Sequence, residues 1–207
     1  MAGFKKLYQE LKRKNGGAGP QWRLWRKRKK TEKDREEIII GAILTQRTNW
    51  KNVELAIGNL KDAKINSLSA LYRLGRKNKK KLAVLIKPSG FYRAKADYLF
   101  ALTKFIIEKY GGIAEMKNAP LRALRKELLA QKGVGPETAD SILLYALDKP
   151  IFVIDEYTRR FVKERGLCGK LSYDALQKLF QKNLPKSVRT YQDFHALIVT
   201  EGKMARS

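Results

Sequence analysis

The apolar residues of this sequence recur mostly with the spacing of α-helices, and this pattern restricts the fold more than any other feature. From Glu36 onward the apolar side chains form one broad helical face, and a longer helical pattern runs from about Tyr92 to Tyr110. Only residues 150–154 resemble a strand, and such a short, isolated run cannot form a sheet. The pattern therefore predicts an all-α fold. Further helical patterns cover about residues 53–60, 120–129, 136–147, 173–184 and 188–201.

The excess of positive charge indicates a polyanionic partner. The chain has 45 Lys and Arg residues against 20 Asp and Glu residues, a formal net charge of +25. Such an excess repels itself unless a polyanion neutralises it, and nucleic acid is the usual candidate. A membrane surface or ribosomal RNA would fit the charge equally well. Lysine-rich surfaces also occur in heat-adapted proteins, but those usually balance lysine with glutamate, which this chain does not.

The composition also excludes several classes of protein. Hydrophobic residues make up 43% of the chain, as in ordinary globular proteins, and no apolar stretch approaches the ~20 residues that span a bilayer. The first residues lack the apolar core of a signal peptide, so we expect a cytoplasmic protein without membrane contact. The only cysteine, Cys168, excludes an internal disulfide and a thiolate-bound metal cluster.

Two glycines between helical patterns form a candidate phosphate-binding turn. One helical pattern ends before Gly133 and Gly135, and Pro136 suits the first turn of the next helix. Glycine permits unusual torsions and close approach, and the free N–H groups at a helix start attract a phosphate oxygen. The preceding carbonyls could converge on a monovalent cation. Taken alone, Gly-x-Gly is equally consistent with a tight helix–helix turn.

Two further motifs accompany this turn. Asp155 lies 20 positions after Gly135, behind the apolar run 152–154 and ahead of a helical pattern. Upstream, residues 43–48 read Ile-Leu-Thr-Gln-Arg-Thr. The three motifs, in this order, resemble the helix–hairpin–helix (HhH-GPD) DNA glycosylases, the endonuclease III-like group. The resemblance covers most of the chain.

The resemblance implies two helical lobes with an active-site cleft between them. It implies a basic N-terminal segment, residues 1–34, that packs with the C-terminal lobe. Residues 35–149 would form a barrel-like lobe with the hairpin, and residues 150–207 would hold the catalytic aspartate and the C-terminal helices. The expected protein is a nucleoid-associated monomer whose partner is double-stranded DNA with damaged bases. As a base excision repair enzyme it would flip such a base out of the duplex and release it.

The resemblance assigns catalysis to Asp155. A carboxylate beside the sugar stabilises the positive charge that develops as the glycosidic bond breaks, and it can orient or deprotonate the attacking water. The alternative role of Asp155 is a helix N-cap. Both roles are compatible, because a cap fixes the direction of the carboxylate.

The resemblance also assigns the hairpin residues. Contacts with DNA phosphate are implied for Lys132, Gly133, Val134, Gly135, Glu137 and Thr138. The carbonyls of Leu129, Gln131 and Val134 would hold K⁺ or Na⁺, and no other cofactor is required.

Two departures from endonuclease III narrow the expected activity. Strand-nicking members carry a lysine two residues after the second hairpin glycine, where this chain has Glu137. We therefore expect a monofunctional enzyme, although a substitute lysine such as Lys132 stays open. The chain also lacks the four cysteines of the family's iron–sulfur cluster, so no cluster is expected. In these departures, and in residues 87–92, the chain is similar to the cluster-free 3-methyladenine DNA glycosylase branch.

The aromatic residues favour a cationic base as substrate. Trp50 lies where that branch places a ring against the flipped base, and Trp22 and Trp25 could form the opposite wall. An electron-rich indole attracts the charged ring of 3-methyladenine. For all three tryptophans, the alternative to contact with the base is packing in the protein core. Gln46 would enter the duplex as a wedge, and its alternative is a helix C-cap contact.

Other readings stay open. The lone histidine, His195, lies on an apolar helical face and suggests a structural role. Tyr157, Arg159 and Arg160 could touch phosphate or form a solvated basic face. Rival functions are a glycosylase for mismatched uracil or thymine, or for oxidised bases, with or without lyase activity. A non-catalytic helix–hairpin–helix DNA-binding module is the rival from another class.

Overall fold

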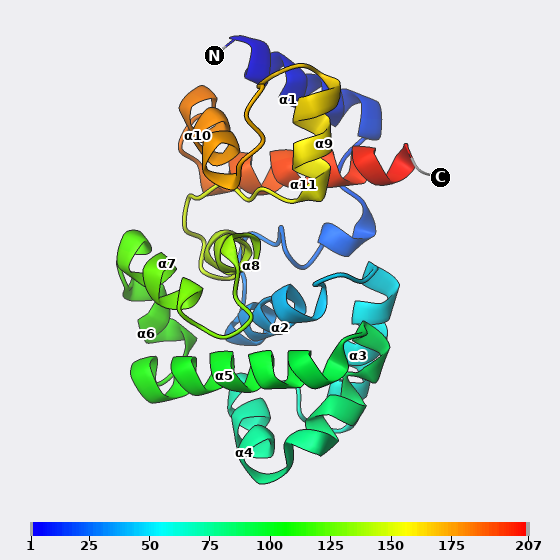
Figure 1. The fold of residues 1–207 in the computed structure, drawn as a ribbon. Helices are drawn as coiled ribbons and strands as arrows, with labels where there is room; N and C mark the ends of the chain where they lie inside the picture. The colour runs from blue at the N-terminus through cyan, green and yellow to red at the C-terminus, as the bar shows by residue number, and fades with distance from the viewer. Residues whose placement is uncertain (1, 206–207) are drawn as a thin grey trace. The chain divides into compact units, whose positions relative to one another are not determined.

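The computed structural model describes residues 2–205, and within them the chain forms helices and no strand. The predicted all-α class is confirmed (Figure 1). The elements are α1 (Ala2–Asn15), η1 (Pro20–Trp22), α2 (Glu32–Leu44), α3 (Trp50–Asp62), α4 (Leu68–Leu85), η2 (Lys87–Ser89), α5 (Tyr92–Tyr110), α6 (Ile113–Asn118), α7 (Leu121–Leu129), α8 (Pro136–Ser141), η3 (Ile142–Ala146), α9 (Glu156–Glu164), α10 (Tyr173–Asn183) and α11 (Val188–Met204).

The helices form two compact units. Unit 1 combines Met1–Arg28 with Leu143–Ser207, and unit 2 is Lys29–Ile142. The two expected helical lobes therefore exist as separate sets of contacts, whose boundaries fall at residues 28 and 142. None of the described helices is long and apolar enough to cross a membrane.

Unit 1 is built around α11, which packs against α1 and α9. The basic N-terminal segment gave no clear helical pattern, yet α1 is a helix that buries Phe4 and Leu11. The ring of Phe4 meets Phe180 of α10 edge-on at 5.1 Å, and Phe180 stacks on Phe152 at 4.2 Å. Burial of these rings stabilises the packing of α1 against the core of unit 1, although the helix carries many lysines.

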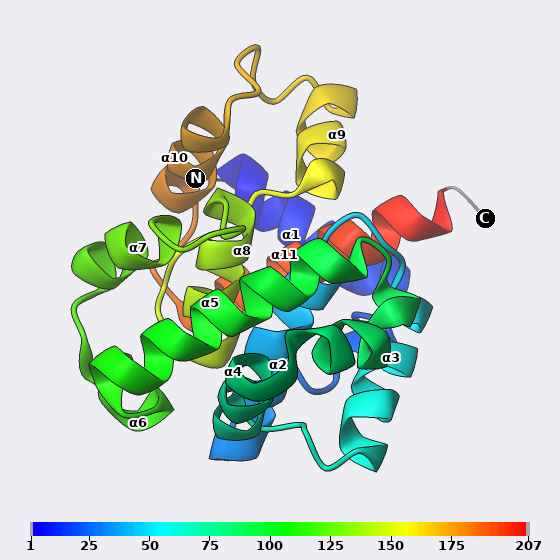
Figure 2. The same ribbon diagram turned by 60° about the horizontal axis from the view of Figure 1, so that its bottom comes forward.

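Unit 2 is built around α2 and α5 (Figure 2). Residues Ile38–Leu44 of α2 are all buried. This helix begins at Glu32, four residues earlier than expected, because Thr31 forms a capping box with Asp34.

A buried lysine fixes the end of α2. The Lys95 ammonium donates to the carbonyls of Leu44 and Ser89 at 2.8 and 2.6 Å. Burial lowers the pKa of Lys95 to about 8. This cation caps the C-terminal end of α2, where the Gln46 loop begins.

Two helices are irregular. The pattern over residues 136–147 predicted one α-helix, but the structure has α8 followed by the π-helix η3. Helix α4 is interrupted at Asn78, whose torsions (φ −156°, ψ 81°) are not helical. The Asn78 side chain then caps the next turn by accepting from the N–H of Lys81 at 2.9 Å.

Candidate active site

Asp155 stands at the N-cap of α9 in unit 1. Its Oδ1 accepts from the backbone N–H of Thr158 at 2.7 Å and from the Thr158 hydroxyl at 2.8 Å. The Asp155 side chain is 13% exposed. The cap therefore fixes the carboxylate in direction and leaves Oδ2 for other contacts.

His195 of α11 faces that second oxygen. Its Nε2 lies 3.5 Å from Oδ2 of Asp155, at the limit of hydrogen-bond distance, and its Nδ1 lies 2.7 Å from the Tyr145 hydroxyl. The Tyr145 hydroxyl also lies 3.3 Å from the carbonyl of Gln192. Asp155, His195 and Tyr145 therefore form a buried polar chain that connects α9, α11 and η3.

The electrostatics keep Asp155 ionised. Burial acts to raise the pKa of Asp155, but His195 and the two Thr158 bonds outweigh it, so the pKa lies below its ordinary value. Burial and the charge of Asp155 both raise the pKa of Tyr145, whose hydroxyl therefore keeps its proton. Burial lowers the pKa of Lys203, whereas the charge of Asp155 acts on it in the opposite direction.

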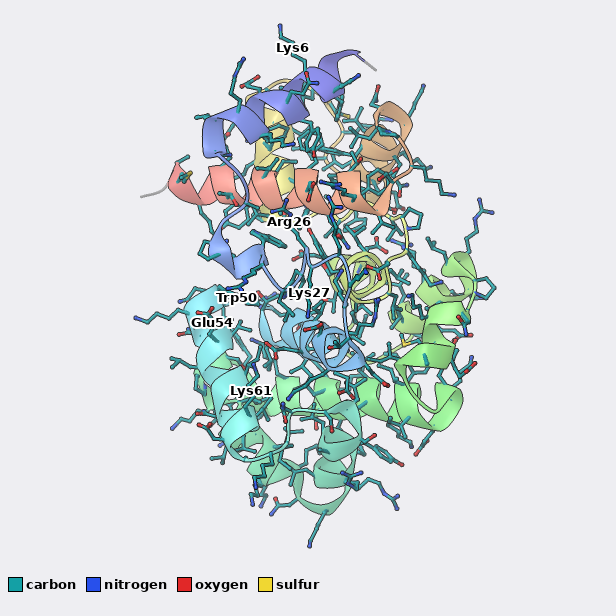
Figure 3. All side chains as sticks on the ribbon, turned by 180° about the vertical axis from the view of Figure 1, so that it is seen from behind. Lys6, Arg26, Lys27, Trp50, Glu54 and Lys61 are labelled. Carbon is teal, nitrogen blue, oxygen red and sulfur yellow. The ribbon has the colours of Figure 1, made fainter. Side chains whose placement is uncertain are left out.

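Two tryptophans of unit 1 join this cluster. The Trp22 ring meets the His195 ring edge-on at 5.6 Å, and Trp25 lies 5.2 Å from the ring of Tyr145. Arg26, labelled in Figure 3, anchors this segment by pairing with Asp193 of α11 at 2.7 Å. Trp25 is only 6% exposed, so it offers little free surface to a ligand.

Two buried polar atoms of this cluster have no hydrogen-bond partner among the described residues. They are Nε1 of Trp22 and Nε2 of His195, whose 3.5 Å contact with Oδ2 of Asp155 is an ion-pair contact rather than a well-formed hydrogen bond. Most buried polar atoms in folded proteins are paired, and exceptions gather where a protein binds or transforms a ligand. The Asp155 cluster is therefore the candidate active site of unit 1.

The predicted hairpin lies in unit 2 between α7 and α8. Gly133 has φ +77°, which favours glycine, and a Cβ there would lie 2.2 Å from Cγ of Tyr98. Gly135 precedes α8 in extended conformation, is exposed, and has open space where a Cβ would be. Val134, between them, is buried. The first glycine therefore serves packing within unit 2, and the second leaves the backbone open to approach.

Gln46 contacts the hairpin in this structure. Its amide donates to the carbonyl of Gly133 at 2.9 Å and to the Thr138 hydroxyl at 3.0 Å. The C-cap of α2 is Thr45, so Gln46 does not fill that alternative role. To act as a wedge, Gln46 would have to exchange these two bonds for bonds to a base.

The remaining predicted residues are more exposed. Trp50 begins α3, is half-buried, and donates its indole N–H to Glu54 at 2.8 Å (Figure 3). Trp50 belongs to unit 2, whereas Asp155 belongs to unit 1. Lys132 is exposed and lies 3.4 Å from Asp97, and Glu137 is exposed in the first turn of α8.

The ligands of the predicted cation site would be backbone carbonyl oxygens rather than side chains. In the described part of the chain, no group of three or more His, Cys, Asp or Glu side chains could hold a metal ion. The carbonyl of Gln131 accepts from the Val134 N–H at 3.1 Å, which leaves one lone pair for a cation. The cation site at Leu129, Gln131 and Val134 stays a prediction.

The sequence did not reveal two members of the site. His195 was expected to be structural because of its apolar neighbours, and it contacts Asp155 only through the packing of α11 on α9. Tyr145 had no motif around it. The lone histidine in a chain with a candidate catalytic carboxylate was the only available signal.

Comparisons with known proteins identify the family of this chain. Residues 40–186 match the profile of the HhH-GPD superfamily base excision DNA repair proteins. A Methanocaldococcus jannaschii protein, described as a candidate DNA repair glycosylase, is 48% identical over 172 residues, which cover 82% of this chain and 77% of that protein. Endonuclease III of Thermotoga maritima is 29% identical over 161 residues, covering 76% of this chain and 68% of the enzyme.

A solved structure extends the similarity over nearly the whole chain. The 3-methyladenine DNA glycosylase of H. pylori, bound to 1,N6-ethenoadenine, superposes with a TM-score of 0.79 at 30% identity and covers 97% of both chains. The profile match spans more than half of this sequence and includes both the hairpin and Asp155. The chain therefore belongs to the HhH-GPD superfamily of base excision DNA repair glycosylases.

Proposed function

We propose that this DNA glycosylase is monofunctional and releases alkylated purines, such as 3-methyladenine, from double-stranded DNA. The observation that carries the proposal is the Asp155 cluster. An ionised carboxylate lies there beside an imidazole, whose Nε2 faces it at 3.5 Å, and an indole with an unpaired buried nitrogen. The similarity to the H. pylori 3-methyladenine DNA glycosylase supports the choice of substrate.

In the proposed reaction, Asp155 acts on the sugar and on water. The bond between C1′ and the purine breaks, and the electron pair leaves with the cationic base, which becomes neutral. The Asp155 carboxylate stabilises the positive sugar and orients a water molecule, whose oxygen bonds to C1′. A proton of that water passes to the carboxylate and then to solvent. The products are the free base and an intact strand with an abasic site.

An aromatic pocket would choose the base. Trp22 lies in the Asp155 cluster, where its indole would contact the base. The contact of Trp50 with the base stays a prediction. Indole faces attract cationic rings by about 0.5–2 kcal/mol. A methylated purine is already a good leaving group, so this attraction and one carboxylate suffice. Trp25 would support Trp22 from behind rather than touch the base.

We assign a positioning role to His195. Tyr145 has one hydroxyl proton, and its contact with Nδ1 of His195 is shorter than its contact with the carbonyl of Gln192. Donation to Nδ1 places the imidazole proton on Nε2, facing Oδ2 of Asp155. His195 thereby orients the free oxygen of Asp155 and helps to keep it ionised.

Replacing His195 should change the pH dependence of base release. In His195→Leu, the main influence that lowers the pKa of Asp155 is lost, and burial raises that pKa. A carboxylate with a raised pKa protonates at higher pH, so activity should fall earlier as the solution is acidified. A rise of one unit corresponds to about 1.4 kcal/mol, or about tenfold in the rate on the acid side. Single-turnover rates measured across pH would show the shift.

His195→Gln is the matched variant. Its amide places an N–H near the position of Nε2, so it should retain more activity than the leucine variant. If both variants kept the wild-type pH profile, His195 would have only a packing role.

The proposed function is tested by base release from methylated duplex DNA. Under single-turnover conditions, the enzyme should free methyladenine, and strand breaks should appear only after alkali. If duplex is bound but no methylated base leaves, the substrate assignment is wrong. Duplexes with uracil, mismatched thymine and oxidised guanine would then identify the substrate.

The alternative to a monofunctional enzyme is a glycosylase with lyase activity, in which an amine attacks C1′, displaces the base and forms a Schiff base. Glu137 cannot supply that amine, and the lysine to test is Lys203, whose pKa is lowered by burial. Borohydride would trap such an intermediate as a covalent complex with DNA. A trapped complex that Lys203→Gln abolishes would replace the monofunctional assignment.

A further inference from the structure

A dense run of positive charge lies on α4, a helix that holds none of the residues assigned so far. Six cations occur within nine positions, all of them exposed and without an intervening acid. We call this set the α4 basic run. It comprises Arg73, Arg76, Lys77, Lys79, Lys80 and Lys81.

The fold does not account for this run. Among the described residues, only Lys79 of the six pairs with a carboxylate, that of Asp97 at 2.7 Å. Arg76 lies over the ring of Tyr72, and Lys79 lies over the ring of Phe100. Six neighbouring cations with one acidic partner repel one another, so they lower the stability of α4.

The run is connected to the hairpin within unit 2. Asp97 of α5 is shared by Lys79 of α4 and by Lys132 of the hairpin, at 2.7 and 3.4 Å. The next residue, Tyr98, packs against Gly133. The α4 basic run and the hairpin are therefore neighbours on one unit, joined across α5 (Figure 2).

We propose that the α4 basic run binds the phosphate backbone of the same DNA duplex, to one side of the damaged base. The proposal rests on the proposed function, because that function brings duplex DNA to the hairpin. Nine residues of a continuous helix would span about 12 Å, a length that the break at Asn78 changes at one residue only, and one strand of a duplex carries a charge every ~3.4 Å of its axis. The run therefore matches about three or four phosphates of the nearer strand.

Such a contact would be electrostatic and independent of sequence. Lysine side chains bind phosphates as mobile point charges, and they position a duplex without reading its bases. The run would lengthen the DNA segment held by the enzyme and help it to retain DNA while it searches for damage.

The test removes three charges and leaves the packing intact. The variant K77Q/K80Q/K81Q keeps Lys79, whose pairing with Asp97 supports the connection to the hairpin. The control K104Q/K117Q/R122Q removes the same charge from exposed positions on α5, α6 and α7 of the same unit. Affinity for an undamaged duplex is measured over a range of salt concentrations for both variants and for the wild type.

We expect the slope of log K against log[salt] to fall by up to about 2.7 in the α4 variant, about 0.9 for each lost phosphate contact. The substitutions of the control variant should change this slope by much less. A second measurement lengthens the duplex on one side of a damaged base at a time. The wild type should gain affinity when one particular side is lengthened, and the α4 variant should not.

The outcomes separate this proposal from the proposed function. Equal changes of slope in both variants would reduce the run to general surface charge and overturn the inference. The inference would also be overturned if lengthening the duplex raised the affinity of the α4 variant as much as it raised the affinity of the wild type. Base release from a short methylated duplex under saturating enzyme should be unaffected by the α4 substitutions. If the wild type released no base at all, the proposed function would fail while the binding measurements still decided the role of the run.

Discussion

Asp155→Asn should abolish base release and leave both the fold and DNA binding intact. The variant keeps an oxygen that can accept from the N–H and hydroxyl of Thr158, so the N-cap of α9 survives. It removes the negative charge that would stabilise the sugar cation and orient water. The expected loss in the single-turnover rate is about 10²- to 10⁴-fold, the range for one general base or one preorganised electrostatic contact.

The stability of this variant should fall slightly. The pKa of Asp155 lies below its ordinary value, so the ionised carboxylate stabilises the folded protein relative to the unfolded chain, and this contribution is lost with the charge. Thermal unfolding should therefore occur slightly below the wild-type temperature. DNA binding should be equal or slightly tighter, because one negative charge is lost near a polyanion.

Glu156→Gln is the matched control for charge. It removes the neighbouring carboxylate, which is exposed in the first turn of α9. Base release should remain within about twofold of the wild type, as for a surface charge. If Asp155→Asn kept the wild-type rate on methylated duplex, the catalytic assignment of Asp155 would be wrong. A loss of equal size in Glu156→Gln would point to net charge rather than to the site.

Gly133→Ala should have the second largest effect, this time on stability. Its added Cβ would lie 2.2–2.4 Å from three ring atoms of Tyr98, and φ at this position is +77°. The backbone strain and the displaced ring together should cost about 3 kcal/mol. For a chain of this size that corresponds to about 6–12 °C in the unfolding temperature. Circular dichroism on heating would measure it, and DNA affinity should fall as well.

Gly135→Ala separates the DNA contact from the fold. Its φ is −86°, and nothing lies within 4 Å of the added Cβ, so stability should be unchanged or higher by about 0.4–1 kcal/mol. DNA affinity should nevertheless fall about tenfold, because the methyl group occupies the surface that a phosphate would approach. Wild-type affinity in this variant would mean that DNA does not approach the hairpin at Gly135.

The features that could be predicted from the sequence are those encoded by neighbouring residues. Helical periodicity marked α5 at Tyr92–Tyr110, and proline and glycine marked the turn between α7 and α8. Asp155 was assigned through the family resemblance, which rests on its spacing from Gly135 and on the apolar run and helical pattern on either side of it. The capping box of α2 and the π-helix were not predicted, because each depends on the final positions of a few side chains and backbone groups after the helices have packed.

Only the tertiary structure decided which distant side chains meet. The amide of Gln46 bonds to a carbonyl 87 positions away, and the hydroxyl of Tyr145 meets an imidazole 50 positions away. The approach of His195 to Asp155 depends in the same way on the packing of α11 against α9. The sequence by itself determined the helices, the hairpin and the candidate carboxylate, because periodicity and turn chemistry are local. The partners of that carboxylate were decided by packing, since helix contacts between distant segments have no local signature in the chain.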